Sequence, residues 1–148
     1  METSNVTISE PQTQEEFGAY FLLRYNVLRK PWNQPIGSEK DDKENEAIHA
    51  MAMDSAKTVV GVCRMQYNTT ELAQLRYMAV LPEYQRGRIG YKLVAYLETI
   101  AKTNGIKKMQ LHTRENAYPF YIKCGYKLVE KSYLLWGEIQ HYLMEKQL

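Results

Sequence analysis

A short loop that contains glycine and arginine joins an apolar segment to an amphipathic one. Arg86, Arg88 and Lys92 place positive charge in this loop and at the start of the segment that follows. A loop that opens a helix presents free backbone N–H groups and the positive end of the helix dipole, and both attract anions. Gly87 and Gly90 would let the backbone approach such an anion closely. These residues predict a binding site for a pyrophosphate, although the same composition is also typical of an ordinary loop between a strand and a helix.

The residues of this loop resemble the acyl-CoA-binding segment of the GNAT family of N-acetyltransferases, in particular its small bacterial single-domain members. The family pattern is Gln or Arg, two residues, Gly, one residue, then Gly or Ala. Gln85 and Gly90 match its two ends, whereas Arg88 stands where most members have glycine and Gly87 lies one place earlier. A second block, Ala117–Tyr126, resembles the family's late Ala-x-x-Phe-Tyr-x-x-x-Gly-Phe/Tyr segment. Two blocks in this order are much more specific than either alone.

The resemblance implies that acetyl-CoA is a co-substrate and indicates which residues contact it. In the family, two parallel strands splay apart, and the pantetheine arm pairs with free backbone groups of the first strand, whose N–H groups polarise the thioester carbonyl. Without that resemblance, Tyr77–Val80 would be read as an ordinary central strand. The implied cofactor contacts lie at the end of this strand, in the loop and around the second block: Met78, Ala79, Val80, Gln85, Arg86, Gly87, Arg88, Ile89, Gly90, Arg114, Asn116, Ala117 and Phe120. Many members carry an asparagine where Arg114 stands, so the contacts of Arg114 and Asn116 are the least fixed.

Tyr121 is the catalytic residue that the resemblance implies. When an amine attacks acetyl-CoA the leaving group is a thiolate, and a phenol with a pKa near 10 can donate a proton to it. Tyr121 occupies the place of the family's tyrosine in the second block. The competing interpretation is that Tyr121, one of twelve tyrosines, only packs in the core, but Phe120 is the better core residue of the two.

A general base must take a proton from the acceptor's ammonium group, and no motif fixes its identity. The candidates are Glu46, His49, Glu71 and His112, and a chain of water molecules is the alternative. A single histidine on a strand is more often a hydrogen-bonded structural residue, and His141 is ambiguous in the same way.

Periodicity predicts an α/β fold with a mixed, mostly antiparallel sheet flanked by helices, and the resemblance adds two splayed parallel central strands. Thr13 and Glu16 form a capping-box pattern that begins the first helix, and Pro31 ends it. The stretch Trp32–Glu46 is predicted to be a mobile loop, with or without one short helix. Strands are expected at residues 6–8, 47–53, 58–67, 72–80, 108–113, 126–136 and 139–145, a helix after the glycines that ends near residues 104–105, and a short helix at 119–123.

Composition agrees with one acyltransferase domain over residues 1–148. A chain of 148 residues with 45% apolar and 24% charged residues is ordinary for one globular core. The net charge of +2 argues against a nucleic-acid partner, and we expect no metal site, no signal peptide and no membrane span. Cys63 and Cys124 are far apart and indicate reduced thiols in the cytoplasm. Cys124 as a nucleophile is disfavoured because no histidine supports it locally.

The function that follows is transfer of an acetyl group from acetyl-CoA to an amine by direct attack. The alternative is a non-catalytic acyl-CoA sensor of the same fold, since Arg88 and Arg114 depart from the family pattern. The acceptor, a small-molecule or peptide amine, should be chosen by the first helix, the Trp32–Glu46 loop and Trp136–Glu138, where the loop acids either attract an amine or are merely solvated. Tyr133–Trp136 could form an exposed apolar face for a homodimer.

Overall fold

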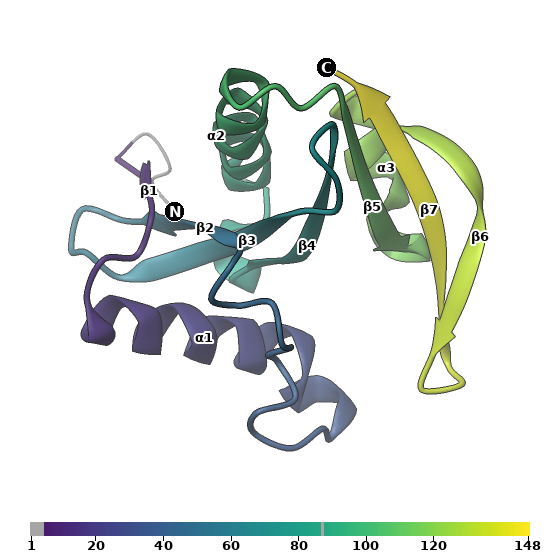
Figure 1. Ribbon diagram of the computed structural model, residues 1–148. Coiled ribbons are helices and arrows are strands. Elements are labelled where there is room, and N and C mark those ends of the chain that lie inside the picture. Colours follow the sequence, from purple (N-terminus) through teal and green to yellow (C-terminus); the bar gives the residue numbers. More distant parts are fainter. Residues whose placement is uncertain (1–4, 87) are drawn as a thin grey trace. The chain divides into compact units, whose positions relative to one another are not determined.

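The computed structural model describes residues 5–86 and 88–148 (Figure 1). Within these residues, seven strands form one sheet in the order β1-β2-β3-β4-β5-β7-β6. The strands are β1 (Thr7–Ser9), β2 (Ile48–Met53), β3 (Val59–Tyr67), β4 (Leu72–Val80), β5 (Lys108–Arg114), β6 (Lys127–Leu135) and β7 (Ile139–Gln147). β4 pairs with β5 in parallel, whereas the pairs β1–β2, β2–β3, β5–β7 and β6–β7 are antiparallel, as in the predicted mixed sheet.

The chain divides into two compact units. The first contains the residues up to Gln66 together with Tyr77–Leu97, and the second contains Tyr67–Arg76 and Glu98–Leu148. The helices are α1 (Gln14–Leu28), α2 (Ile89–Thr103) and α3 (Tyr118–Lys123), with short 3-10 helices η1 (Lys30–Trp32), η2 (Pro82–Tyr84) and η3 (Glu115–Ala117). The β4 strand and the α2 helix each contribute to both units.

In the first unit, α1 and the first half of α2 pack against opposite faces of the strands. The capping box forms as predicted: the Glu16 backbone N–H donates to Thr13 Oγ1 at 3.0 Å, and the Thr13 backbone N–H donates to Glu16 Oε1 at 3.3 Å. Tyr20 and Leu23 of α1 pack with Val62 of β3. Gly61, the preceding residue, faces α2 instead, because successive residues of a strand point to opposite faces.

In the second unit, β5 pairs with β7 from Lys108–Gln147 to Arg114–His141, and β7 pairs with β6. The short helix α3 packs against β7 through an edge-to-face contact between Tyr118 and Tyr142, with ring centroids 6.4 Å apart. The hairpin between β6 and β7 turns at Trp136 and Gly137, which both have positive φ. β6 is the last strand of the sheet, and most of its residues are exposed.

The predicted elements all exist, and β4 has the predicted bounds, but one of the two alternatives left open for the loop acids, that they are merely solvated, does not hold for all of them. Residues 33–47 have no helix or strand, as expected. However, Glu39 is buried, and Asp41 and Glu44 form ion pairs with buried arginines. The loop is therefore anchored to the core of the first unit rather than merely solvated.

Candidate functional site

The β4 strand leads through η2 and a short loop into α2, and this passage contains most of the predicted cofactor contacts. Gln85 Nε2 donates to the Val80 carbonyl at 3.0 Å, which ties the loop back to the end of the strand. Arg86 and Arg88 are exposed, and Arg88 has a φ of 67°. Its carbonyl accepts from Lys92 N–H at 3.2 Å, in the first turn of α2. The arrangement presents two guanidinium groups at a helix N-terminus, whereas the predicted contact at Gly87 lies outside the described residues.

A glycine that the sequence analysis did not single out allows α2 to approach the sheet. A Cβ atom at Gly61 of β3 would lie 2.9 Å from Ile89 Cγ2 and 3.3 Å from Leu93 Cδ1. Both distances are shorter than ordinary contacts, so Gly61 is required for the close packing of the first turns of α2. Because Ile89 begins the helix, Gly61 also positions the helix N-terminus at the end of β4.

The β4 strand changes conformation midway along its length. Its described register with β5 runs from Leu72–Lys108 to Leu75–Leu111. Two residues later, Tyr77 has a φ of 59°, in the left-handed region that an aromatic residue rarely adopts. Such a conformation costs on the order of 1–3 kcal/mol and persists only where surrounding contacts hold it. Beyond Tyr77, Met78 and Val80 are half-buried and Ala79 is buried.

Two buried arginines provide those surrounding contacts. The guanidinium carbons of Arg24 and Arg64 lie 4.3 Å and 4.9 Å from the centroid of the Tyr77 ring, and both side chains are 0% exposed. Arg64 binds both carboxylate oxygens of Asp41, and Arg24 donates to Glu44 Oε2 at 2.9 Å. The arginines join α1 and β3 to the loop and to Tyr77 of β4. The sequence analysis missed this network, because its members are far apart in the chain.

His49, one of the candidate bases, belongs to the same network. Its Nδ1 lies 2.8 Å from the Tyr20 hydroxyl, and its Nε2 lies 2.7 Å from the Glu44 carbonyl oxygen. Burial lowers the pKa of the His49 imidazole, and it raises the pKa of Tyr20, so both side chains favour their neutral forms. Both ring nitrogens of His49 are therefore engaged, an arrangement that is typical of a structural histidine.

Tyr121 lies in the second unit on α3, and it is 7% exposed. Its ring makes edge-to-face contacts with Phe120 and with Tyr126, with centroids 4.8 Å and 6.0 Å away. Tyr126 in turn donates to Glu98 Oε2 at 2.8 Å, and Lys146 Nζ donates to Glu98 Oε1 at 2.9 Å. Tyr121 is therefore buried against the Tyr126 ring, whose hydroxyl is held by Glu98.

The same lysine fixes the end of the helix that carries Tyr121. Lys146 Nζ donates to the Cys124 carbonyl at 2.9 Å, where α3 ends. A cation at a helix C-terminus complements the helix dipole. Burial raises the pKa of the Cys124 thiol to about 11, which disfavours its thiolate form.

The remaining site candidates of the second unit are spread along β5, η3 and α3. Arg114 ends β5, Asn116 is exposed on η3, and Ala117 and Phe120 are half-buried. His112 has a buried Nδ1 with no hydrogen-bond partner among the described residues, and burial lowers its pKa. Of the candidate bases outside the network, Glu71 forms an exposed ion pair with Lys107, and Glu46 of the first unit is exposed.

Comparison with known proteins decides the family. The profile of the Acetyltransferase (GNAT) family matches residues 11–126, which is most of the chain. The protein belongs to the GNAT acetyltransferase family. It is 29% identical over 136 residues to an uncharacterized N-acetyltransferase, YjcF, of Bacillus subtilis (strain 168), covering 91% of this chain and 95% of that relative.

Solved structures share the GNAT fold. A putative N-acetyltransferase from Lactobacillus plantarum is 19% identical with a TM-score of 0.85, covering 97% of this chain and 98% of that one. An aminoglycoside 6′-N-acetyltransferase complexed with coenzyme A is 22% identical with a TM-score of 0.79, covering 95% and 96%.

Members of the GNAT family use acetyl-CoA, and the α2 N-terminus of this member suits the anionic part of that molecule. Arg86 and Arg88 are exposed beside a fifteen-residue helix that starts at Ile89. No group of three or more potential ligands that could hold a metal occurs among the described residues. Likewise, none of the described helices is both long and apolar enough to cross a membrane.

Proposed function

We propose that this GNAT acetyltransferase transfers an acetyl group from acetyl-CoA to an amine by direct attack. The observation that carries the proposal is the passage from the β4 strand, with its positive φ at Tyr77, to the α2 N-terminus. Tyr77 has a φ of 59° within β4, and the loop that follows the strand offers two exposed arginines beside a helix dipole. We further propose that residues 1–148 act as one acyltransferase domain in the cytoplasm, where Cys63 and Cys124 remain free thiols.

Two parts of this passage would bind different parts of acetyl-CoA. Residues 85–90 and the first turn of α2 would hold the pyrophosphate through N–H groups and the Arg86 and Arg88 side chains. The backbone of Met78–Val80 would pair with the pantetheine arm, and an N–H group there would stabilise the oxyanion that forms on the thioester carbonyl. From the second unit, Arg114, Asn116, Ala117 and Phe120 are the proposed further contacts.

Tyr121 is the proposed general acid. The amine nitrogen attacks the thioester carbonyl carbon, a C–N bond forms, and the C–S bond breaks with its electron pair on sulfur. Tyr121 donates its phenolic proton to that thiolate and recovers a proton from solvent. Its burial beside Phe120 and Tyr126 supports this role, because a fixed phenol loses little freedom when it donates.

The proton that the amine loses needs a separate acceptor. His49 is a poor choice because both of its ring nitrogens are engaged. His112 retains an unpartnered Nδ1 among the described residues, and Glu46 and Glu71 are exposed. We therefore propose His112, Glu46, Glu71 or a water chain as the base. We also propose that the exposed Tyr133 and Leu134 of β6 allow a homodimer.

A screen of amine acceptors tests the proposal directly. Free thiol released from acetyl-CoA is followed together with the acetylated amine by mass spectrometry. Transfer predicts equal amounts of thiol and acetylated amine for at least one acceptor class. Binding of acetyl-CoA without any product would instead favour the alternative of a non-catalytic acyl-CoA sensor.

A further inference from the structure

A hollow of about 620 Å³ lies in the first unit between the start of α1, the start of β2 and the loop before it. This volume falls within the range of about 300–1,000 Å³ that is usual for small-ligand sites. The residues of its wall that matter here are Phe17, Phe21, Lys40, Asp41, Glu44 and His49. Aromatic rings and carboxylates therefore surround the same space, a combination that suits a cation with an apolar body.

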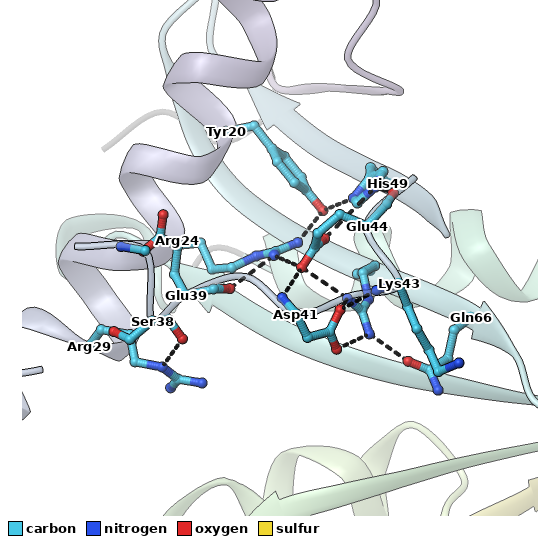
Figure 2. Close-up of polar contacts among 12 residues, drawn as sticks. Tyr20, Arg24, Arg29, Ser38, Glu39, Asp41, Lys43, Glu44, His49 and Gln66 are labelled. Atoms are coloured by element: carbon cyan, nitrogen blue, oxygen red, sulfur yellow. Dashed lines mark hydrogen bonds and ion pairs between the residues drawn. The ribbon is translucent and has the colours of Figure 1, made fainter. Parts of the chain in front are cut away.

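The two carboxylate oxygens of Glu44 differ in their hydrogen bonding (Figure 2). Oε2 accepts from Arg24 Nη1 at 2.9 Å, from Arg64 Nη1 at 3.0 Å and from the Asp41 N–H at 3.0 Å. Oε1 is buried and has no hydrogen-bond partner among the described residues. The nearby His49 Nε2 is 4.0 Å away and already contacts the Glu44 carbonyl oxygen. Glu44 therefore retains an acceptor for a donor that comes from outside the network.

The ring of Phe21 already attracts cations. Lys40 Nζ lies 4.3 Å from its centroid, and the Arg24 guanidinium carbon lies 4.9 Å from it. Arg24 is fully buried and fixed by its ion pair, whereas Lys40 is exposed and can leave the ring. Lys40 thus shows where an ammonium group is stabilised in this hollow, and its side chain would compete with a ligand for the same ring face.

The charges around the hollow disfavour an anionic ligand. Asp41 and Glu44 balance the two buried arginines, and Lys40 contributes one positive charge. Glu10 and Asp42 also line the hollow, so its remaining side chains are net negative. Burial lowers the pKa of the His49 imidazole, which disfavours a positive charge there.

We propose that this hollow binds a primary amine with an apolar body, with the ammonium group on Glu44 Oε1 and the face of Phe21 in place of Lys40. The apolar body would lie against the Phe17 ring, which stacks on Phe21 at a centroid distance of 6.1 Å. That this amine is the acetyl acceptor rests on the proposed function, whereas the binding of the amine to the hollow does not.

Calorimetric titration in the absence of acetyl-CoA tests the site, with phenethylamine as the probe and phenethyl alcohol as its neutral counterpart. The amine should bind at least about tenfold more tightly than the alcohol, because only the amine carries the ammonium group. Lys40→Met should tighten amine binding by roughly three- to tenfold, since it removes the competing cation from Phe21. Lys43→Met is the matched control: Lys43 is exposed in the same loop and is not among the lining residues.

A second pair of variants tests the carboxylate. Glu44→Gln should weaken amine binding by about tenfold or more, whereas Glu15→Gln, at an exposed residue in the first turn of α1 and outside the lining, should leave it unchanged. Glu44→Gln also removes the negative charge that pairs with two buried arginines, so this variant can fail to fold. Lys40→Met and Lys43→Met change exposed side chains, so this pair tests the site in a folded protein.

Equal affinity for the amine and the alcohol would overturn the site, and so would equal effects of Lys40→Met and Lys43→Met. Different results would reject the proposed acetyl transfer and the proposed amine site. Amine binding that follows these variants, without any acetylated product, would support the hollow and reject acetyl transfer. Acetyl transfer with amine binding unaffected by Lys40→Met would support the function and reject the hollow.

Discussion

The guanidinium carbon of Arg24 lies 4.3 Å from the centroid of the Tyr77 ring, and this contact links α1 to the residue of β4 that has a positive φ. Arg64 lies 4.9 Å from the same ring, and Asp41 and Glu44 neutralise both arginines. The loop before β2 and the strand proposed to hold the pantetheine arm are therefore parts of one buried network. A substitution of the loop carboxylates should therefore alter the surroundings of Tyr77.

Replacing Arg24 with methionine should destabilise the protein by about 3 kcal/mol or more, because it removes one member of a buried ion-pair network. Urea unfolding followed by circular dichroism measures the change in the free energy of unfolding. Lys30→Met, which removes an exposed cation at the start of η1, should change that free energy by less than about 0.5 kcal/mol. If the two substitutions changed the free energy of unfolding equally, the buried network would not contribute to stability as argued.

Gly61→Ala should destabilise the protein by about 1–3 kcal/mol, since its Cβ would lie 2.9 Å from Ile89 Cγ2 and force α2 to move. The affinity for acetyl-CoA should fall as well. Gly18→Ala is the matched control, because nothing lies within 4 Å of its Cβ and it sits inside α1. That substitution should stabilise the protein by about 0.5–1 kcal/mol, and a similar gain at Gly61 would exclude the packing role.

The helices and strands could be predicted from the sequence more fully than the contacts around the site. Local patterns sufficed for the capping box at Thr13 and for the bounds of β4. They could not reveal the pairing of Asp41 with Arg64, because that contact joins residues 23 positions apart and depends on how the chain folds back. The positive φ of Tyr77 was hidden for the same reason, since no residue type at that position signals it.

Two histidines should make the stability of the protein depend on pH. Burial lowers the pKa of His49 and of His112 in the folded protein, while in the unfolded chain each has a pKa of about 6.5. Below that pH the unfolded chain takes up protons first, so the free energy of unfolding should fall as the pH drops from about 7 to 5. His49→Gln and His112→Gln should each reduce this slope. An unchanged slope in both variants would show that neither imidazole is held neutral.

Acetyl-CoA and CoA should both raise the melting temperature, because they bind the folded protein. Gly90→Val should abolish this shift, since a β-branched side chain would block the approach of a phosphate to the first turn of α2. Gly18→Val is the control, at a helical glycine with nothing within 4 Å of its Cβ, and should keep the shift. A normal shift in Gly90→Val would remove this loop from cofactor binding.

The turnover of Tyr121→Phe tests the central claim most directly. The substitution removes one hydroxyl and leaves the ring packed against Phe120 and Tyr126. With an acceptor from the screen, we expect kcat to fall by about 10²–10⁴ while acetyl-CoA affinity barely changes, because the hydroxyl acts only on the departing thiolate. The loss should be smaller with an acyl donor whose leaving thiol is more acidic. An unchanged kcat would contradict the account and remove Tyr121 from the mechanism.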